Sequence, residues 1–251
     1  MHFEAFLFDV DGTLADTERD GHRVAFNRAF ADAGLDWDWD AALYGELLAV
    51  TGGKERIRHY LERFHPDFEA DGPLDAFIAG LHRAKTAHYT RLLADPGIPL
   101  RPGVLRILET ARASGIRLSI ATTTTPDNVM ALLEHSIAPD AADWFEVIAA
   151  GDIVPEKKPA PDIYRYALDQ MGLTADCALA FEDSENGVRS ARGAGLATIV
   201  TVNDYTRDQD FHGAVAVLDG FGEPQAPCRA IAGAAPAGGV VDLDFLQSLA
   251  R

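Results

Sequence analysis

The chain has 251 residues, 47 % of them hydrophobic and 24 % charged, and its formal net charge at pH 7 is −17. This is the composition of a folded globular protein, and the length allows one large domain or a domain with an insert. The negative charge repels nucleic acids and anionic membranes, so we expect neither as a partner. A phosphate ligand would require positive charge gathered locally, from a divalent metal and a few lysines.

No segment of the sequence is long and apolar enough to span a bilayer. The N-terminus leads directly into an apolar run without a basic region or a cleavage site. The two cysteines, Cys177 and Cys228, lie far apart and lack the spacing of a zinc site or a disulfide framework. We therefore expect a cytoplasmic protein that acts as a monomer.

Two carboxylates, Asp9 and Asp11, directly follow the apolar run at residues 5–8. Because residues i and i+2 of a strand point to the same side, both carboxylates are predicted to converge where a buried strand ends. Gly12 allows the backbone to turn sharply away at that point. The arrangement suits a magnesium-assisted attack on phosphorus. An Asp-Gly turn that closes a β-hairpin is the alternative, and this short motif alone does not decide between them.

Residues 15–92 show helical periodicity and no convincing strand. Apolar residues at the spacing of one helix face recur early in this stretch, at Phe26, Ala29, Phe30 and Ala33. We predict a helical cap domain over residues 15–92, inserted into a core formed by residues 1–14 and 93–251. A cap in this position could close over the carboxylates as a lid. Another layer of the same core is the alternative.

Within the predicted cap, the run Thr51-Gly52-Gly53-Lys54 precedes a helical segment at residues 55–61. Free amides at a helix start, together with one ammonium group, could bind a second phosphate that does not react. The run is not a Walker A loop, because the required spacing is absent. A glycine-containing helix start with a solvated lysine is the alternative.

Short apolar runs alternate with helical patterns through the rest of the chain, at residues 117–121, 147–150, 178–181 and 198–202. One helix is predicted between Pro102 and Gly115, with an apolar face formed by Val104, Leu105, Leu108 and Ala111. A second runs from Pro161 to Gly172, and residues 220–239 are predicted to form a loop. This order predicts an α/β fold with a doubly wound, Rossmann-like parallel sheet.

Polar residues follow two of these predicted strands. Thr122, Thr123 and Thr124 come after the 117–121 run, and their hydroxyls and amides could bind phosphate oxygens, although a turn with local hydrogen bonds is the alternative. Lys158 follows the 147–150 run and precedes Pro159, which biases the lysine toward an extended backbone. This bias would hold one ammonium group in place. A solvated surface lysine is the alternative.

Two acids, Glu182 and Asp183, follow the 178–181 run. Magnesium prefers oxygen ligands and is usually held by one or two carboxylates plus a substrate phosphate. Asp9, Asp183 and the backbone carbonyl of Asp11 fit that demand, with Glu182 in or near the coordination shell. The acids could also cap the following helix, and both interpretations can hold. Because open α/β sheets bind ligands at the carboxyl ends of their strands, these motifs together predict one site.

The set Asp9-x-Asp11-Gly12-Thr13, Thr122, Lys158-Pro159 and Glu182-Asp183 resembles the four motifs of the haloacid dehalogenase superfamily of phosphatases and phosphomutases. The resemblance covers essentially the whole chain. The predicted cap has the position found in the branch that contains β-phosphoglucomutase and small sugar-phosphate phosphatases. Within that branch, residues 8–18, 50–56 and 120–125 resemble the CbbY family, which is associated with removing xylulose 1,5-bisphosphate, an inhibitor of Rubisco.

The resemblance implies that Asp9 is the nucleophile, which forms an aspartyl-phosphate, and that Asp11 is first the general acid and then the base toward water. It implies a Mg²⁺ cofactor held by a set of acids: Asp9, Asp11, Glu182 and Asp183. Thr122 and Lys158 would stabilise the transferring phosphoryl group.

The resemblance also implies a set of substrate contacts: Glu18, Tyr44, Gly52, Gly53, Lys54, Thr122, Thr123, Thr124 and Lys158. Among these, Glu18 and Tyr44 would contact sugar hydroxyls. The run at residues 19–22 is one residue longer than in some relatives, so the helix register and the role of His22 stay open.

Taken together, these motifs predict a magnesium-dependent phosphatase acting on a small phosphorylated sugar, for example xylulose 1,5-bisphosphate. A β-phosphoglucomutase-type mutase is the alternative, since it would use the same two aspartates and transfer the phosphoryl group to a second sugar hydroxyl instead of water. A phosphate-sensing or non-catalytic regulatory module would share the acids, threonine and lysine. Such a module would have no use for the helical insert or for Asp11.

Overall fold

The computed structural model describes residues 2–95 and 97–250, in which seven strands form one sheet of order β3-β2-β1-β4-β5-β6-β7. The strands are β1 (Ala5–Phe8), β2 (Arg117–Thr122), β3 (Val147–Ala150), β4 (Ala178–Glu182), β5 (Ala197–Thr201), β6 (Ala216–Leu218) and β7 (Ala230–Gly233). Strands β1 to β6 are parallel, and β7 pairs antiparallel with β6. The predicted α/β fold with a parallel sheet and a helical insertion is confirmed.

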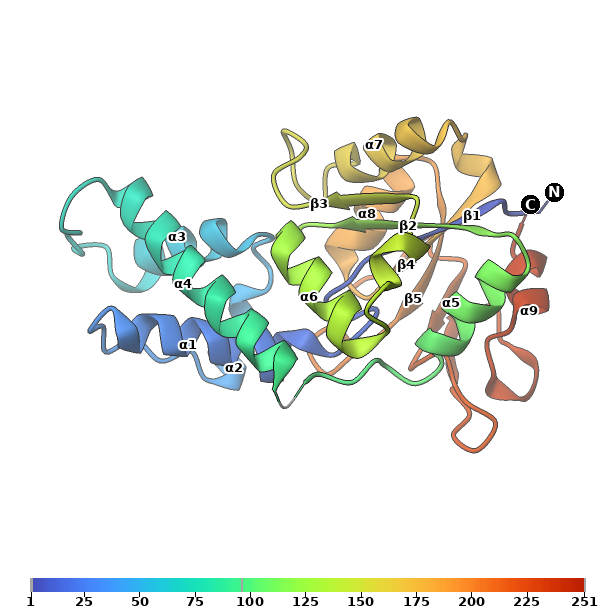
Figure 1. The fold of residues 1–251 in the computed structure, drawn as a ribbon, viewed down its shortest axis with the longest axis horizontal. Coiled ribbons are helices and arrows are strands. Elements are labelled where there is room, and N and C mark those ends of the chain that lie inside the picture. The colour runs from blue at the N-terminus through green and yellow to red at the C-terminus, as the bar shows by residue number, and fades with distance from the viewer. Residues whose placement is uncertain (1, 96, 251) are drawn as a thin grey trace.

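Helices cover both faces of the sheet (Figure 1). Those of the core are α5 (Val104–Ala113), α6 (Pro126–Ser136), α7 (Asp162–Met171), α8 (Glu185–Gly193) and α9 (Leu243–Ser248). Strand β1 shows why both faces are covered, because its side chains alternate between them. Phe6 and Phe8 pack with residues of α5 and α6, whereas Ala5 and Leu7 pack with residues of α7 and α8. All four are completely buried, as expected for a central parallel strand.

The insertion lies at one end of the core, and its regular elements between residues 18 and 94 are all helices, joined by loops (Figure 1). It contains the π-helix η1 (Glu18–His22), α1 (Arg23–Asp32), α2 (Ala41–Leu47), α3 (Gly53–Phe64) and α4 (Leu74–Ala94). A separate apolar cluster, rich in aromatic residues such as Phe30 and Trp39, holds these helices together. No described helix is long and apolar enough to cross a membrane.

The two connections between insertion and core lie side by side, because Ala15 pairs with Leu100. The C-terminal end of α4 continues into the core, where Tyr89 and Leu93 join the core cluster. Packing is therefore continuous across the seam. The cap bounds of 15 and 92 remain a prediction.

Three local predictions differ from the structure. Leu105 is 39 % exposed, because the buried face of α5 contains Ile107 instead. Ala33 is exposed, since α1 ends at Asp32. The predicted loop at residues 220–239 contains strand β7, whose four residues are all exposed, unlike those of the other strands.

Candidate active site

The predicted motifs meet at one edge of the sheet. Asp9 and Asp11 follow β1, and Thr122 ends β2. Glu182 ends β4 and Asp183 follows it. Since β1 lies between β2 and β4, parallel pairing brings these carboxyl ends together.

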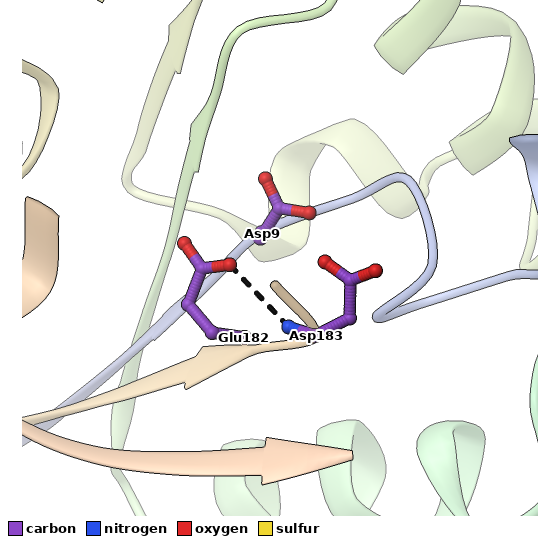
Figure 2. Close-up of side chains that lie close together, drawn as sticks. All are labelled: Asp9, Glu182 and Asp183. Atoms are coloured by element: carbon purple, nitrogen blue, oxygen red, sulfur yellow. Dashed lines mark hydrogen bonds between the residues drawn. The ribbon is translucent and has the colours of Figure 1, made fainter. Parts of the chain in front are cut away.

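Three buried carboxylates form the centre of this edge (Figure 2). Oxygen atoms of Asp9, Glu182 and Asp183 all lie within 4.8 Å of one another. Burial and the nearby Glu182 carboxylate raise the pKa of Asp9 to about 7, although Lys158 opposes the rise. Burial also raises the pKa of Asp183 well above its usual range, and Asp9 and Glu182 add to this effect. Negative charge is therefore concentrated here beyond what the nearby protein cations neutralise.

Lys158 and Tyr164 contact one side of this centre. The Lys158 ammonium donates to Asp9 Oδ1 at 2.7 Å and to Glu182 Oε1 at 2.6 Å. The Tyr164 hydroxyl donates to the same glutamate oxygen at 2.6 Å. Burial alone would lower the pKa of Lys158, but the two carboxylates outweigh it and raise that pKa. Lys158 is thus held as a charged group. Both oxygens of Glu182 accept from the protein, because the Asp183 amide donates to Oε2 at 3.4 Å (Figure 2).

The centre fits a divalent cation. Magnesium takes oxygen ligands and compensates the repulsion between clustered carboxylates. Asp9 and Asp183 are suited to bind it, because Glu182 already accepts from Lys158 and Tyr164. The carboxylate of Asp11 does not belong to the close set and turns toward the insertion instead.

Asp183 is positioned by two neighbours. Asn203 Nδ2 donates to Asp183 Oδ2 at 2.7 Å. Gly12, with φ of +86°, packs its Cα directly against Asp183, and a Cβ there would collide with the carboxylate. A glycine is required at this position both for its backbone conformation and for the close approach.

Asp11 is the end of a chain of polar contacts from the insertion. Asp11 Oδ1 accepts from the Thr17 hydroxyl at 2.5 Å and lies 2.7 Å from His22 Nε2. On the other side of the imidazole, Lys85 Nζ lies 2.6 Å from His22 Nδ1. Burial would raise the pKa of Asp11, but His22 and Thr17 outweigh it, so its pKa lies below the usual range.

The open question of the register at residues 19–22 has a structural answer. These residues belong to a π-helix, η1. Its hydrogen bonds span five residues instead of the four of an α-helix, so one turn contains an additional residue. The wider turn directs His22 to Asp11, and the imidazole stacks on Tyr89 with ring centroids 4.0 Å apart. The geometry therefore links His22 with the active-site aspartate.

Glu18 and Tyr44 also meet at the site. The Tyr44 hydroxyl donates to Glu18, and Arg56 Nη1 donates to the Tyr44 hydroxyl at 3.0 Å. Arg56 and Tyr44 are both buried. The carboxylate of Glu18 and the guanidinium of Arg56 line the cavities described next.

Two adjoining cavities lie over the strand ends, between core and insertion. The smaller, of about 90 Å³, is lined by the catalytic candidates Asp9, Thr122, Lys158 and Asp183, among others. The larger, of about 600 Å³, extends between the start of α3, α4 and the loop after β3. Asp11, Glu18 and Thr123 line the larger one. A substrate in these cavities would contact core and insertion at once.

All four lysines of the chain line these two cavities. Lys54, Lys85 and Lys157 line the larger one, and Lys158 lines the smaller one. Burial, together with the charge of the surrounding lysines, lowers the pKa of His82, which also lines the larger cavity, to about 3. In a chain of net charge −17, the lysines are thus concentrated where an anion would enter.

The predicted phosphate contacts at the start of α3 lie on the larger cavity. Gly52, Gly53 and Lys54 all line it. Lys54 Nζ also donates to Asp152 Oδ2 at 2.5 Å, across the seam between insertion and core. Lys54 is therefore at the predicted place but already has an acidic partner.

The threonine run divides between two roles. Thr122 is buried and lines the smaller cavity, and Thr123 lines both. Thr124 lines the larger cavity and accepts from Asn128 Nδ2 at 2.9 Å, while Thr125 caps α6. Thr124 and Thr125 thus form the local hydrogen bonds of a turn, which was the alternative to a phosphate-binding role.

Sequence reasoning missed several residues of the site: Thr17, Arg56, Lys85, Tyr164 and Asn203. Thr17, Arg56, Lys85 and Tyr164 reach the site through the tertiary structure and not through a motif at a strand end. Asn203 directly follows the run predicted as a strand at residues 198–202, so its place at a strand end was visible in the sequence. One signal was available for Lys85, because a chain with only four lysines has few candidates for binding an anion.

The comparisons with known proteins agree with this geometry. The family model described as haloacid dehalogenase-like hydrolase matches residues 3–195. The chain belongs to the haloacid dehalogenase-like hydrolase family. The resemblance inferred from the four motifs is thereby confirmed.

Relatives within this family include CbbY proteins. The chain is 50 % identical to protein CbbY of Cereibacter sphaeroides over 88 % of its own length and 93 % of the relative. It is 47 % identical to a solved CbbY of Rhodobacter sphaeroides, an aspartate-to-asparagine variant in complex with xylulose 1,5-bisphosphate, with a TM-score of 0.82 over 95 % and 99 % of the two chains. A β-phosphoglucomutase of Clostridium difficile, at 21 % identity and a TM-score of 0.69 over 87 % and 91 %, shares the fold.

Proposed function

We propose that this hydrolase is a magnesium-dependent phosphatase that acts on a small bisphosphorylated sugar of the xylulose 1,5-bisphosphate type. The observation that carries the proposal is the placement of all four lysines around two adjoining cavities, of which only the smaller contains the acidic centre. One phosphate would react at that centre. The other would be bound in the larger cavity.

The first step assigned to the site is transfer of the phosphoryl group to Asp9. A carboxylate oxygen of Asp9 attacks phosphorus, and the bond from phosphorus to the sugar oxygen breaks. Asp11 gives its proton to that oxygen, because an alkoxide is a poor leaving group. Lys158 and Thr122, which both line the smaller cavity, lie where negative charge spreads over the transferring oxygens.

The second step is hydrolysis of the aspartyl-phosphate. Asp11, now ionised, takes a proton from water as the water oxygen bonds to phosphorus and the bond to Asp9 breaks. Inorganic phosphate is released and Asp11 regains its proton. The lowered pKa of Asp11 favours its ionised form and therefore suits this second step more than the first.

Mg²⁺ held by Asp9 and Asp183 would supply positive charge to the phosphoryl oxygens. Lys158 orients the Asp9 carboxylate through its Oδ1 atom. Asn203 orients Asp183 in the same way.

The rest of the substrate would lie toward the insertion. Glu18, held by Tyr44, faces the cavities and would accept hydrogen bonds from sugar hydroxyls. Lys54 and the amides at the start of α3 would bind the phosphate that does not react. Because that phosphate must share Lys54 with Asp152, binding of the substrate would rearrange this ion pair.

A phosphate-release screen tests the proposal. Xylulose 1,5-bisphosphate, ribulose 1,5-bisphosphate and the corresponding monophosphates are each offered with Mg²⁺ and with EDTA. We expect Mg²⁺-dependent release, highest kcat/KM for bisphosphates, and none from Asp9→Asn. The product sugar is analysed in parallel, because isomerised sugar phosphate without free phosphate would identify a mutase. Failure to release phosphate from any bisphosphate would refute the proposal.

A further inference from the structure

Arg101 lies where the chain returns from the insertion to the core. Its neighbour Leu100 pairs with Ala15, and its own amide donates to Leu14 O at 2.8 Å. The residue is only 7 % exposed, and no motif points to it. Its buried guanidinium therefore lies beside the segment that leads from Asp9 and Asp11 into the insertion.

The guanidinium joins two loops of the site edge. It donates to the carbonyl of Gly12, in the loop after β1. It also donates to the carbonyls of Thr201 at 3.0 Å and Val202 at 2.6 Å, at the end of β5. An ion pair with Asp16 at 3.4 Å adds a contact to the connection itself.

The same two loops position Asp183. Gly12, held by Arg101, packs directly against the Asp183 carboxylate. Asn203 directly follows Val202, also held by Arg101, and its side chain donates to Asp183 Oδ2. Each path from Arg101 to the carboxylate passes through one short backbone segment.

The contacts require a planar, forked donor. An arginine can donate to several acceptors in fixed directions, whereas a lysine ammonium is a compact point charge on a flexible stem. Lysine at this position would preserve a charge and lose the simultaneous contacts to both loops.

We propose that Arg101 is a positioning residue for the cation-binding carboxylate Asp183, acting through Gly12 and Asn203. It contacts neither the substrate nor the reacting atoms. The inference deepens the proposed function and depends on it, because it assigns to Arg101 the geometry of the proposed Mg²⁺ site.

Mg²⁺ binding to the full chain tests the inference. The dissociation constant is measured by isothermal titration calorimetry for wild type, Arg101→Lys and Arg101→Gln, at a temperature where each variant is folded by circular dichroism. We expect the constant to rise about fivefold or more in Arg101→Lys and about tenfold or more in Arg101→Gln. Phosphate release by the two variants should be partly restored when Mg²⁺ is raised to saturation. A residue that only stabilises the fold would not give this dependence on Mg²⁺.

Arg106 supplies a matched control. It also donates to two loop carbonyls, those of Val241 at 2.6 Å and Gly222 at 2.6 Å, and it pairs with Glu223. These contacts lie apart from the acidic centre. Arg106→Lys should lower thermal stability and leave the Mg²⁺ constant unchanged. An equal loss of Mg²⁺ binding in this variant would overturn the inference, because the effect would then be general destabilisation.

Asn203→Ala removes the last contact of one path, and we expect it to weaken Mg²⁺ binding even if the Arg101 variants do not fold. Where Arg101→Lys folds, the two effects should be less than additive in a double-mutant cycle. The inference would be overturned if the dissociation constant for Mg²⁺ in both Arg101 variants, or in Asn203→Ala, equalled that of the wild type. A wild type that binds no Mg²⁺ would instead overturn the proposed function.

Discussion

Lys158 Nζ lies 2.7 Å from Asp9 Oδ1, and both groups are buried. Lys158→Met would leave Asp9 and Glu182 without their shared cation. We expect kcat to fall about 10²-fold or more, because charge stabilisation in the transition state is lost. The free energy of unfolding should fall by about 3 kcal/mol, since an unpaired buried charge remains. Phosphate release and urea unfolding measure the two effects.

The control for this variant is Arg189→Met on α8. Arg189 is exposed and pairs only weakly with Glu185, at 4.0 Å. The free energy of unfolding of Arg189→Met should stay within about 0.5 kcal/mol of the wild-type value, and its kcat should be unchanged. Full activity in Lys158→Met would contradict the assigned role.

Substitution of Lys54 and Asp152 should have opposite effects on the bisphosphate substrate. Lys54→Gln removes the cation, so we expect the KM for a bisphosphate to rise about tenfold and the KM for a monophosphate to stay constant. Asp152→Asn frees Lys54 from its acidic partner, so the bisphosphate KM should fall. Both variants should lose less than about 1 kcal/mol of stability, because the pair is partly exposed. Equal loss for both substrates would exclude a second-phosphate role.

His22 and Thr17 together lower the pKa of Asp11. His22→Ala should raise that pKa and move the pH profile of kcat to higher pH, whether the protonated or the ionised Asp11 limits the rate. We expect kcat at pH 7 to fall about tenfold to a hundredfold, because the Asp11 carboxylate also loses a contact that orients it. Thr17→Val should shift the profile in the same direction and by less. An unshifted profile in His22→Ala would show that the imidazole does not act on Asp11.

The lowered pKa of Lys85 should make the stability of the wild type depend on pH. Burial lowers its pKa from 10.5 to about 8, so the charged form is disfavoured in the folded protein. Between pH 8 and 10.5 the unfolded chain binds more protons at this site than the folded one, so this cost of folding disappears as pH rises.

We therefore expect Lys85→Met to be more stable than wild type by about 2 kcal/mol at pH 7, with a smaller difference at pH 10. Its kcat should fall, because His22 loses the ammonium contact. Urea unfolding at both pH values is the measurement. A difference that grows with pH would contradict the assigned pKa direction.

The sequence by itself determined the framework of the site. Five apolar runs predicted strands β1 to β5, because a strand buried on both faces must be apolar along its whole length. The motif residues at their ends, such as Asp9, Lys158 and Asp183, followed from the rule that parallel strands end at one edge. These are local patterns, and each can be seen within about ten residues. Two strands were missed. Strand β6 is buried but has only three residues, too few to show a pattern, and the four residues of β7 are exposed.

Only the tertiary structure decided which further side chains complete the site. Lys85 meets His22 across 63 residues of chain, and Arg101 holds Val202 across 101. Lys85 lies on the apolar stripe of α4, between Leu81 and Tyr89, which indicates burial but not a partner, and no motif points to Arg101. The contact of Lys85 depends on how α4 packs against η1, and those of Arg101 depend on how the loops after β1 and β5 meet in the core. Packing between distant segments, and not local periodicity, set these positions.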